Sequence, residues 1–184
     1  MSATCVAFLE LTEFFIMSLE SVLQQINDMS ISSTIRENVN AFPVLESLHV
    51  LGIAIVFGTI LIVDLRLFGV AAHRPSAKRL TSELLPYTWV AFVIVAITGL
   101  LMFMSNPVSY ANNTQFLLKL VFIALAGLNM VWFHSTTYRR IAEWDEDMPP
   151  PTAARVSGAV SFILWVTVIF LGRWIGFTLE TLFF

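Results

Sequence analysis

The chain has 184 residues, of which 57% are apolar and only 12% are charged. Soluble domains carry about twice that share of charged residues, and disordered chains are poor in apolar residues, so both classes are excluded. A single cysteine, Cys5, excludes a disulfide scaffold, and a net charge of −3 with ten basic residues excludes the basic surface typical of nucleic-acid binding. The remaining class is a small membrane protein with several spans.

The first 42 residues predict an amphipathic segment that does not cross the membrane. Residues 5–16 are too short to span a bilayer, and they lack the basic start of a secretory signal. Apolar residues then recur at helical spacing, at Leu19, Val22, Leu23 and Ile26. We expect a helix over residues 20–40 that lies on the outer membrane surface. A peripheral helix packed on the bundle is an equal alternative.

Four later stretches are long and apolar enough for membrane-spanning helices, which need about 20 mostly apolar residues. They are residues 44–72, 84–104, 116–133 and 156–174. Prolines separate them, as expected for helix starts and loops, at Pro43, Pro86, Pro107 and residues 149–151. Short connections place neighbouring helices antiparallel, so we expect an all-α, integral membrane four-helix bundle over residues 43–176. Residues 177–184 form a C-terminal tail.

The distribution of Lys and Arg predicts the orientation in the membrane. Basic residues fall in the loops 73–83 and 136–155, whereas the loop 105–115 carries no charge. Basic residues accumulate in cytoplasmic loops. We therefore expect these two loops in the cytoplasm and both termini outside, in a bacterial inner membrane.

Ionisable side chains inside the predicted spans are candidates for function, because a charge in hydrocarbon is costly and usually faces the bundle interior. Asp64 follows His49 by 15 residues, and His134 follows Lys119 by the same interval. That interval is about 22 Å of helix and returns nearly to the same face. Two parallel helices therefore predict an outer layer with His49 and Lys119, and an inner layer with Asp64 and His134.

Two further charged residues belong to the predicted outer layer. The last span brings Arg173 to this depth, and Glu46 lies one helical turn before His49. Each residue also has an ordinary structural interpretation. His49 hydrogen-bonds Glu46 in that reading, because a buried polar group needs a partner, and the long side chains of Lys119 and Arg173 reach the interface.

The outer layer has the chemistry of a haem b site. Imidazole supplies an axial bond to iron, and the cations of Lys119 and Arg173 would neutralise the two propionates, since a buried carboxylate needs a cationic partner. The alternative cofactor is copper. His49 with Met102 and Met104 supplies the imidazole and thioether ligands that copper accepts.

In the inner layer we expect a hydrogen bond in which Asp64 orients His134, with Arg66 or Arg139 balancing the carboxylate. The less favoured alternative is a second haem held by His134. The two haems would then lie about 22 Å apart along the helix axis.

Several motifs resemble known membrane proteins. Residues 46–52, 64–69 and 116–120, together with Gly172-Arg173, resemble an uncharacterised family of small bacterial four-helix membrane proteins. A more distant resemblance is to CopD-like and HemJ-like membrane proteins, the latter being a haem-containing protoporphyrinogen oxidase. The matching positions are Leu48-His49, Arg66-Leu67-Phe68, His73 and Lys119. The resemblance implies a haem b site ligated by His49.

The sequence thus predicts a membrane haem b protein that transfers electrons. The expected partners are the lipid bilayer, a quinone and further copies of the chain, with no nucleic acid. The alternatives are a copper-handling membrane protein and an accessory subunit without a cofactor. An absorption spectrum separates them, since only haem gives a Soret band.

Overall fold

The computed structural model describes residues 3–69, 76–145 and 149–180, and within these ranges it contains helices and no strand. Four helices are long and apolar enough to cross a membrane. They are α3 (Ala41–Phe68), α4 (Ala77–Ser105), α6 (Thr114–Ser135) and α7 (Thr152–Glu180). The shorter helices are α1 (Ala3–Asn27), α2 (Ser30–Glu37), α5 (Pro107–Ala111) and the 3₁₀-helix η1 (Tyr138–Glu143). The predicted all-α membrane four-helix bundle is confirmed.

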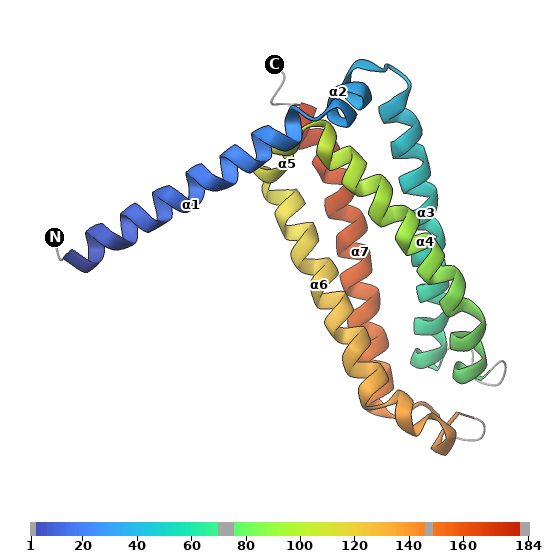
Figure 1. Cartoon of the computed structure of the whole chain (residues 1–184). Helices are drawn as coiled ribbons and strands as arrows, with labels where there is room; N and C mark the ends of the chain where they lie inside the picture. The colour runs from blue at the N-terminus through green and yellow to red at the C-terminus, as the bar shows by residue number, and fades with distance from the viewer. Residues whose placement is uncertain (1–2, 70–75, 146–148, 181–184) are drawn as a thin grey trace.

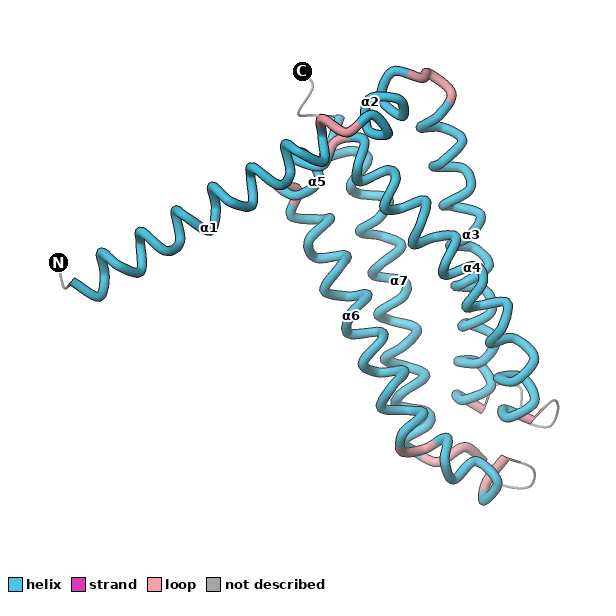
Figure 2. The backbone as a smooth tube through the Cα atoms, in the orientation of Figure 1, coloured by secondary structure: helices cyan, strands magenta, loops and turns pink. Residues whose placement is uncertain are grey.

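The bundle consists of two helical hairpins (Figures 1 and 2). Helix α3 packs on α4, α6 packs on α7, and the contact of α3 with α7 joins the hairpins. One end of the bundle carries α2, α5 and the base of α1, and we name it the N-terminal end (residues 28–42 and 105–114). The opposite end carries the end of α3, the start of α4 and η1. We name it the basic end (residues 66–69, 76–79 and 136–145).

The predicted bounds of the first two spans need correction. Helix α3 ends at Phe68, because Gly69 adopts the left-handed conformation with φ 85° and donates its N–H to the Arg66 carbonyl at 3.1 Å. Helix α4 begins at Ala77, well before the predicted residue 84, and contains Pro86 in its interior. Transmembrane helices tolerate an internal proline because neighbouring groups satisfy the freed carbonyls. Residues 70–75 lie outside the described ranges.

The other two spans agree with their predictions apart from length. Helices α6 and α7 extend beyond the predicted residues 116–133 and 156–174 at both ends. Asn113 begins α6 as its N-cap, because its side-chain oxygen accepts the Phe116 N–H at 3.0 Å. The uncharged loop between α4 and α6 contains the short helix α5, with Pro107 in its first turn.

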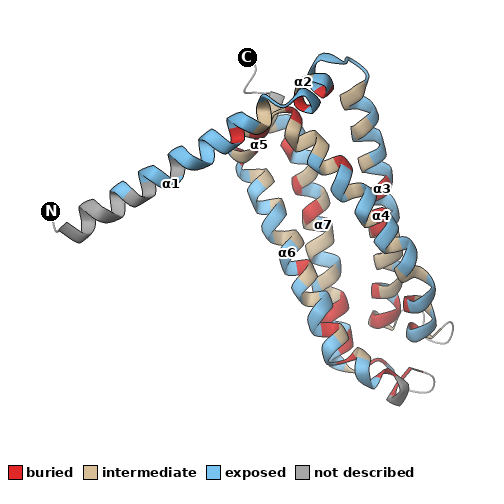
Figure 3. Cartoon of the chain, viewed as in Figure 1, coloured by how far each residue is buried: buried red, intermediate tan, exposed pale blue. Residues whose placement is uncertain are grey.

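The N-terminal segment forms two helices where one was predicted over residues 20–40. The chain breaks between α1 and α2 at Asp28 and Met29. Helix α1 leaves the bundle (Figure 1), and its described side chains are mostly exposed (Figure 3). Helix α2 instead folds back on the bundle. The Arg36 guanidinium donates to the Ser105 carbonyl at 3.0 Å and to Asn27 Oδ1 at 2.8 Å, so this cation meets the carbonyl end of α4.

Small residues allow close approach of the helices, as is usual in membranes. A Cβ on Gly52 of α3 would lie 2.6 Å from Cγ2 of Val95 on α4. A Cβ on Gly158 of α7 would lie 3.2 Å from the Cβ of Leu67 and 3.4 Å from the Asp64 carbonyl oxygen on α3. The contact of α3 with α4 and the contact of α3 with α7 therefore each depend on a glycine.

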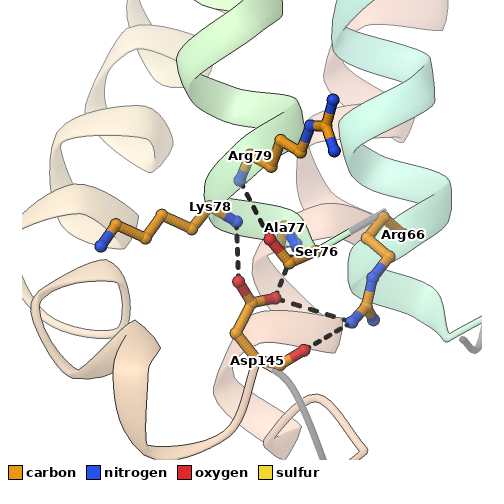
Figure 4. Close-up of polar contacts among 6 residues, drawn as sticks. All are labelled: Arg66, Ser76, Ala77, Lys78, Arg79 and Asp145. Carbon is orange, nitrogen blue, oxygen red and sulfur yellow. Dashed lines mark hydrogen bonds and ion pairs between the residues drawn. The ribbon is translucent and has the colours of Figure 1, made fainter. Parts of the chain in front are cut away.

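A buried ionic network joins three elements at the basic end (Figure 4). Asp145, just after η1, accepts the N–H groups of Ala77 and Lys78 at 2.6 and 2.9 Å, and so caps the start of α4. Arg66, near the end of α3, donates to the Asp145 carbonyl at 3.1 Å and lies 3.6 Å from its carboxylate. Both side chains are 5% exposed. We name this group the Asp145 network (Arg66, Ala77, Lys78 and Asp145).

Apolar side chains shield the Asp145 network from water. Buried residues gather at this end of the bundle (Figure 3), where the apolar cluster consists of Leu67, Ala77, Phe133, Ile141, Trp144 and Ala154. The cluster draws on α3, α4, α6, η1 and α7, so all four spans meet here. Exclusion of water strengthens the ion pair and raises the cost of breaking it.

We expect Asp145→Ala to lower the free energy of unfolding by about 3 kcal/mol, because it removes the carboxylate that pairs with the buried Arg66 guanidinium and caps the start of α4. Unfolding of the detergent-solubilised protein, followed by circular dichroism, measures the change. Glu83→Gln is the control, since Glu83 pairs with Arg79 at 2.8 Å on the exposed surface. Equal stabilities for the two variants would contradict the proposed importance of the network.

Candidate functional site

His49 hydrogen-bonds α4 through one ring nitrogen, and its other ring nitrogen has no hydrogen-bond partner among the described residues. Its Nδ1 lies 2.9 Å from the Thr98 hydroxyl on α4. Thr98 donates its own proton to the Ile94 carbonyl at 2.8 Å, so its oxygen accepts from His49 and Nδ1 carries the hydrogen. The Nε2 lone pair remains available. An imidazole whose second nitrogen donates to a neighbour is the usual arrangement of a metal-ligating histidine.

Gly99 provides the space that the His49 ring occupies. A Cβ at Gly99 would lie 2.9 Å from His49 Cε1 and 3.5 Å from Nδ1. Real Cβ atoms essentially never approach another atom as closely as 2.9 Å. The ring therefore lies against the backbone of α4, where Thr98 and Gly99 fix its position together.

Lys119 lies at the same level of the bundle as His49, as the sequence predicts. Its half-buried side chain crosses Gly172 of α7, so that a Cβ there would be 3.3 Å from the Lys119 ammonium nitrogen. The charge of Lys119 acts on the imidazole of His49. Within the described ranges, Lys119 has no ion-pair partner.

The structure does not bring Arg173 and Glu46 into this group. The exposed Arg173 guanidinium lies over the Phe177 ring, 5.3 Å from its centroid. Glu46 is also exposed, and Thr98 takes the place of the hydrogen-bond partner that Glu46 was expected to give His49. The negative charge of Glu46 acts instead on buried Tyr110 of α5.

Met102 and Met104 belong to the copper alternative, and His73 belongs to the family resemblance. Met102 and Met104 are half-buried on α4. In the part of the chain that the structure describes, no three His, Cys, Asp or Glu side chains gather as a metal site. His73 lies outside the described residues.

A cavity of about 270 Å³ lies among all four spans and contains both members of the predicted inner layer. Asp64 of α3 and His134 of α6 line it together. Its walls are mostly apolar and include four aromatic residues, Trp89, Phe92, Phe133 and Trp165. We name this space the central cavity. Asp64 and His134 thus face a common space, although their hydrogen bonds differ from those expected.

Asp64 and His134 do not form the predicted hydrogen bond with each other. Ser161 of α7 lies near the Asp64 carboxylate, and His134 Nδ1 donates to the Met130 carbonyl at 2.9 Å. The buried Oδ2 of Asp64 has no hydrogen-bond partner among the residues that the structure describes, although Asp64 is only 4% exposed. Arg66 belongs to the Asp145 network and Arg139 is exposed, so neither follows the expected role of balancing Asp64.

Two pairs of polar residues in the cavity wall are hydrogen-bonded across helices. Thr88 of α4 donates to Thr59 of α3 at 2.8 Å. Asn129 of α6 donates to the Ser157 carbonyl at 3.0 Å, and the Ser157 hydroxyl donates back to Asn129 Oδ1 at 3.1 Å. Such interhelical bonds are common between membrane helices. The orphan oxygen of Asp64 is therefore an exception in this wall.

Sequence reasoning missed Thr98, Ser161 and Asp145. Thr98 stands beside Gly99 in an apolar span, which is a signal that a polar side chain of a neighbouring helix needs a partner and space there. Ser161 carries a weaker signal of the same kind. Asp145 lies in an acidic run, and nothing in that pattern distinguishes a buried carboxylate from solvated neighbours.

We expect Gly99→Ala to destabilise the protein by about 1–3 kcal/mol, because the new methyl group overpacks against His49. In a His49→Ala background the same change is expected to be neutral or stabilising, since alanine favours helix by about 1 kcal/mol over glycine. A double-mutant cycle on the free energy of unfolding measures the coupling. Additive effects would show that the ring does not occupy this position.

We expect Glu46→Gln to lower the pKa of Tyr110. Burial, together with the negative charge of Glu46, raises the pKa of this phenol to about 12 from an ordinary value of 10.0. The neutral phenol therefore stabilises the fold below pH 10, and this contribution is lost as the pH rises toward 12. Ultraviolet titration, with Tyr110→Phe to assign the transition, measures the pKa, and Glu83→Gln should leave it unchanged. An unchanged transition in Glu46→Gln would refute the predicted effect of this charge.

Comparison with known proteins identifies one family. No curated protein and no solved structure matches the chain significantly. A family model, described as a family of unknown function (DUF6644), matches residues 31–178. The matched region covers α2 through most of α7, and therefore all four spans, the His49 site and the central cavity. The chain belongs to the DUF6644 family.

Proposed function

We propose that this protein is a haem b electron-transfer protein of the bacterial inner membrane, with His49 as an axial ligand and a quinone as its redox partner. The observation that carries the proposal is the state of the His49 ring. Its Nδ1–H donates to the Thr98 hydroxyl, and its Nε2 has no partner in the part of the chain that the structure describes. This pairing fixes the tautomer and raises the basicity of the ligating nitrogen.

The donor set favours haem over copper. A protein-only metal site needs several ligating side chains. No group of three His, Cys, Asp or Glu exists among the residues that the structure describes, so copper would depend on His49 with the thioethers of Met102 and Met104. Haem would bring its own nitrogen ligands for the iron. A single correctly held imidazole is then sufficient to anchor the iron.

Lys119 supports the same assignment. An ammonium group without an ion-pair partner inside a membrane span is costly, and its usual explanation is an anionic partner or ligand. A haem propionate is such an anion. Because Arg173 lies on the surface, the proposal assigns this role to Lys119 and leaves Arg173 as an interfacial residue.

The residues of the chain and the haem have separate roles. Haem, when bound, supplies a centre that takes up and releases one electron at a time. Thr98 holds the imidazole of His49, Gly99 leaves room for that ring, and Lys119 supplies a positive charge. The apolar helices around them exclude water, which strengthens each electrostatic interaction.

The orientation follows the distribution of basic residues. The basic end carries Lys78, Arg79, Arg139 and Arg140, and we propose that it faces the cytoplasm. The N-terminal end then faces outward, together with α1.

The resemblance of residues around His49 to HemJ-like proteins supports the haem assignment. A homo-oligomer is proposed as the assembled form.

We expect the purified wild-type protein to show a Soret band and His49→Ala to lose its haem. Thr98→Val should weaken haem retention by about 10- to 100-fold, because it removes the hydrogen bond that orients the ligand. Thr88→Val is the matched control, since it removes another α3–α4 hydrogen bond, to Thr59. Pyridine haemochrome spectra measure the haem content of each variant.

Other outcomes of this experiment lead to different functions. A colourless protein that contains copper by elemental analysis would replace the proposal with copper handling. A colourless, metal-free protein would indicate an accessory subunit. Full haem content in His49→Ala would overturn the assignment of this ligand.

A further inference from the structure

We infer that the central cavity binds a quinone-type molecule, a flat apolar ring with oxygen atoms at opposite ends, and that Asp64 is its anchor. This inference deepens the proposed function, on which it rests for the identity of the redox partner. It locates the partner in a space separate from His49. The supporting observations come from the wall of the cavity.

The first observation is the orphan carboxylate oxygen. Asp64 is only 4% exposed, and it lines the cavity with Oδ2 unpaired within the described part of the chain. Ser161 of α7 lies near the carboxylate group of Asp64. A buried unpaired polar atom costs several kcal/mol in a membrane. A ligand in the cavity that hydrogen-bonds to this oxygen removes that cost.

The second observation is a second open hydrogen-bonding atom in the same wall. His134 donates from Nδ1 to the Met130 carbonyl at 2.9 Å, so its Nε2 is left as an acceptor. Asp64 and His134 come from different helices, α3 and α6. The cavity thus offers two polar positions, which suits a ligand with two polar ends better than an amine with a single charged end.

The remaining wall selects an uncharged, flat molecule. The aromatic side chains of Trp89, Phe92, Phe133 and Trp165 stand around the cavity. No Lys or Arg is found among the described residues that line it, so an anionic lipid or fatty acid would lack a cationic partner. Ring-shaped apolar ligands suit such walls, with a few polar groups to fix their orientation.

The carboxyl group of Asp64 suits both oxidation states of this ligand. A carboxylate accepts a hydrogen bond from a hydroquinone hydroxyl, and a protonated carboxyl donates one to a quinone carbonyl. Nε2 of His134 accepts from a hydroquinone hydroxyl, because the ring donates from Nδ1 to Met130. Asp64 is therefore expected to bind either form, whereas an amide at this position would favour the quinone.

The test is a titration of the detergent-purified full chain with decylubiquinone and with its hydroquinone, followed by tryptophan fluorescence. We expect saturable quenching that is reduced in Trp165→Phe, whose side chain lines the cavity. Trp132→Phe should retain the quenching, because Trp132 is exposed on α6 and lies outside the cavity wall. This pair of variants distinguishes binding in the cavity from partition into detergent.

Variants of Asp64 test the anchor. Asp64→Leu should weaken binding of both forms about tenfold, the expected effect of one hydrogen bond to a charged group. Asp64→Asn keeps the side-chain volume and should weaken hydroquinone binding more than quinone binding. Glu83→Gln, which removes an exposed carboxylate outside the cavity, should bind both forms like the wild type. If Asp64→Leu does not fold, Asp64→Asn alone decides.

The results also separate this inference from the haem proposal. His49→Ala should bind decylubiquinone normally even if it lacks haem, and Asp64→Asn should keep its haem spectrum. Equal affinity of wild type and Asp64→Asn for both ligand forms would overturn the inference. So would a linear, unsaturable response to the quinone. Binding of tetraphenylphosphonium that depends on Asp64, without quinone binding, would replace it with an organic-cation site.

Discussion

The arrangement of the bundle depends on one buried carboxylate. Asp145 accepts two backbone N–H groups at the start of α4 and pairs with Arg66 at the end of α3. Because it lies between α6 and α7 in sequence, it ties one hairpin to the other. The ion pair avoids a large desolvation cost only because these donors surround the anion. The central cavity lies against this closed end, since Leu67 and Phe133 belong both to its wall and to the apolar cluster.

Polar groups within the spans divide into those that are satisfied and those that are not. Thr59 with Thr88 and Asn129 with Ser157 form closed interhelical pairs. In contrast, four groups have no partner among the residues that the structure describes: Nε2 of His49, the ammonium of Lys119, Oδ2 of Asp64 and Nε2 of His134. In hydrocarbon a polar group needs an internal partner. These four groups are where the proposed ligands would bind, and they lie in two places, beside His49 and in the central cavity.

Local sequence was a reliable guide to the spans and a poor guide to some of their ends. Four apolar stretches predict four membrane helices because hydrocarbon requires long helical segments. Pro86 misled the prediction, since proline usually marks a helix start, yet a membrane helix tolerates it. Gly69 ended α3 earlier than hydropathy suggested, because backbone conformation rather than apolarity stops a helix. The break at Asp28 and Met29 had no comparable signal in the apolar pattern.

The sequence by itself determined the membrane class, the number of spans, the depth of His49 and Lys119, and the shared side of Asp64 and His134. Helix rise and periodicity are local properties, so spacing along the chain is enough to fix depth and face. Only the tertiary structure decided the partners: Thr98 for His49, Ser161 for Asp64 and Asp145 for Arg66. It also placed Arg173 at the surface and left Oδ2 of Asp64 open to the cavity. Partners depend on how neighbouring helices rotate and on which side chains meet across them, and packing between distant segments sets both.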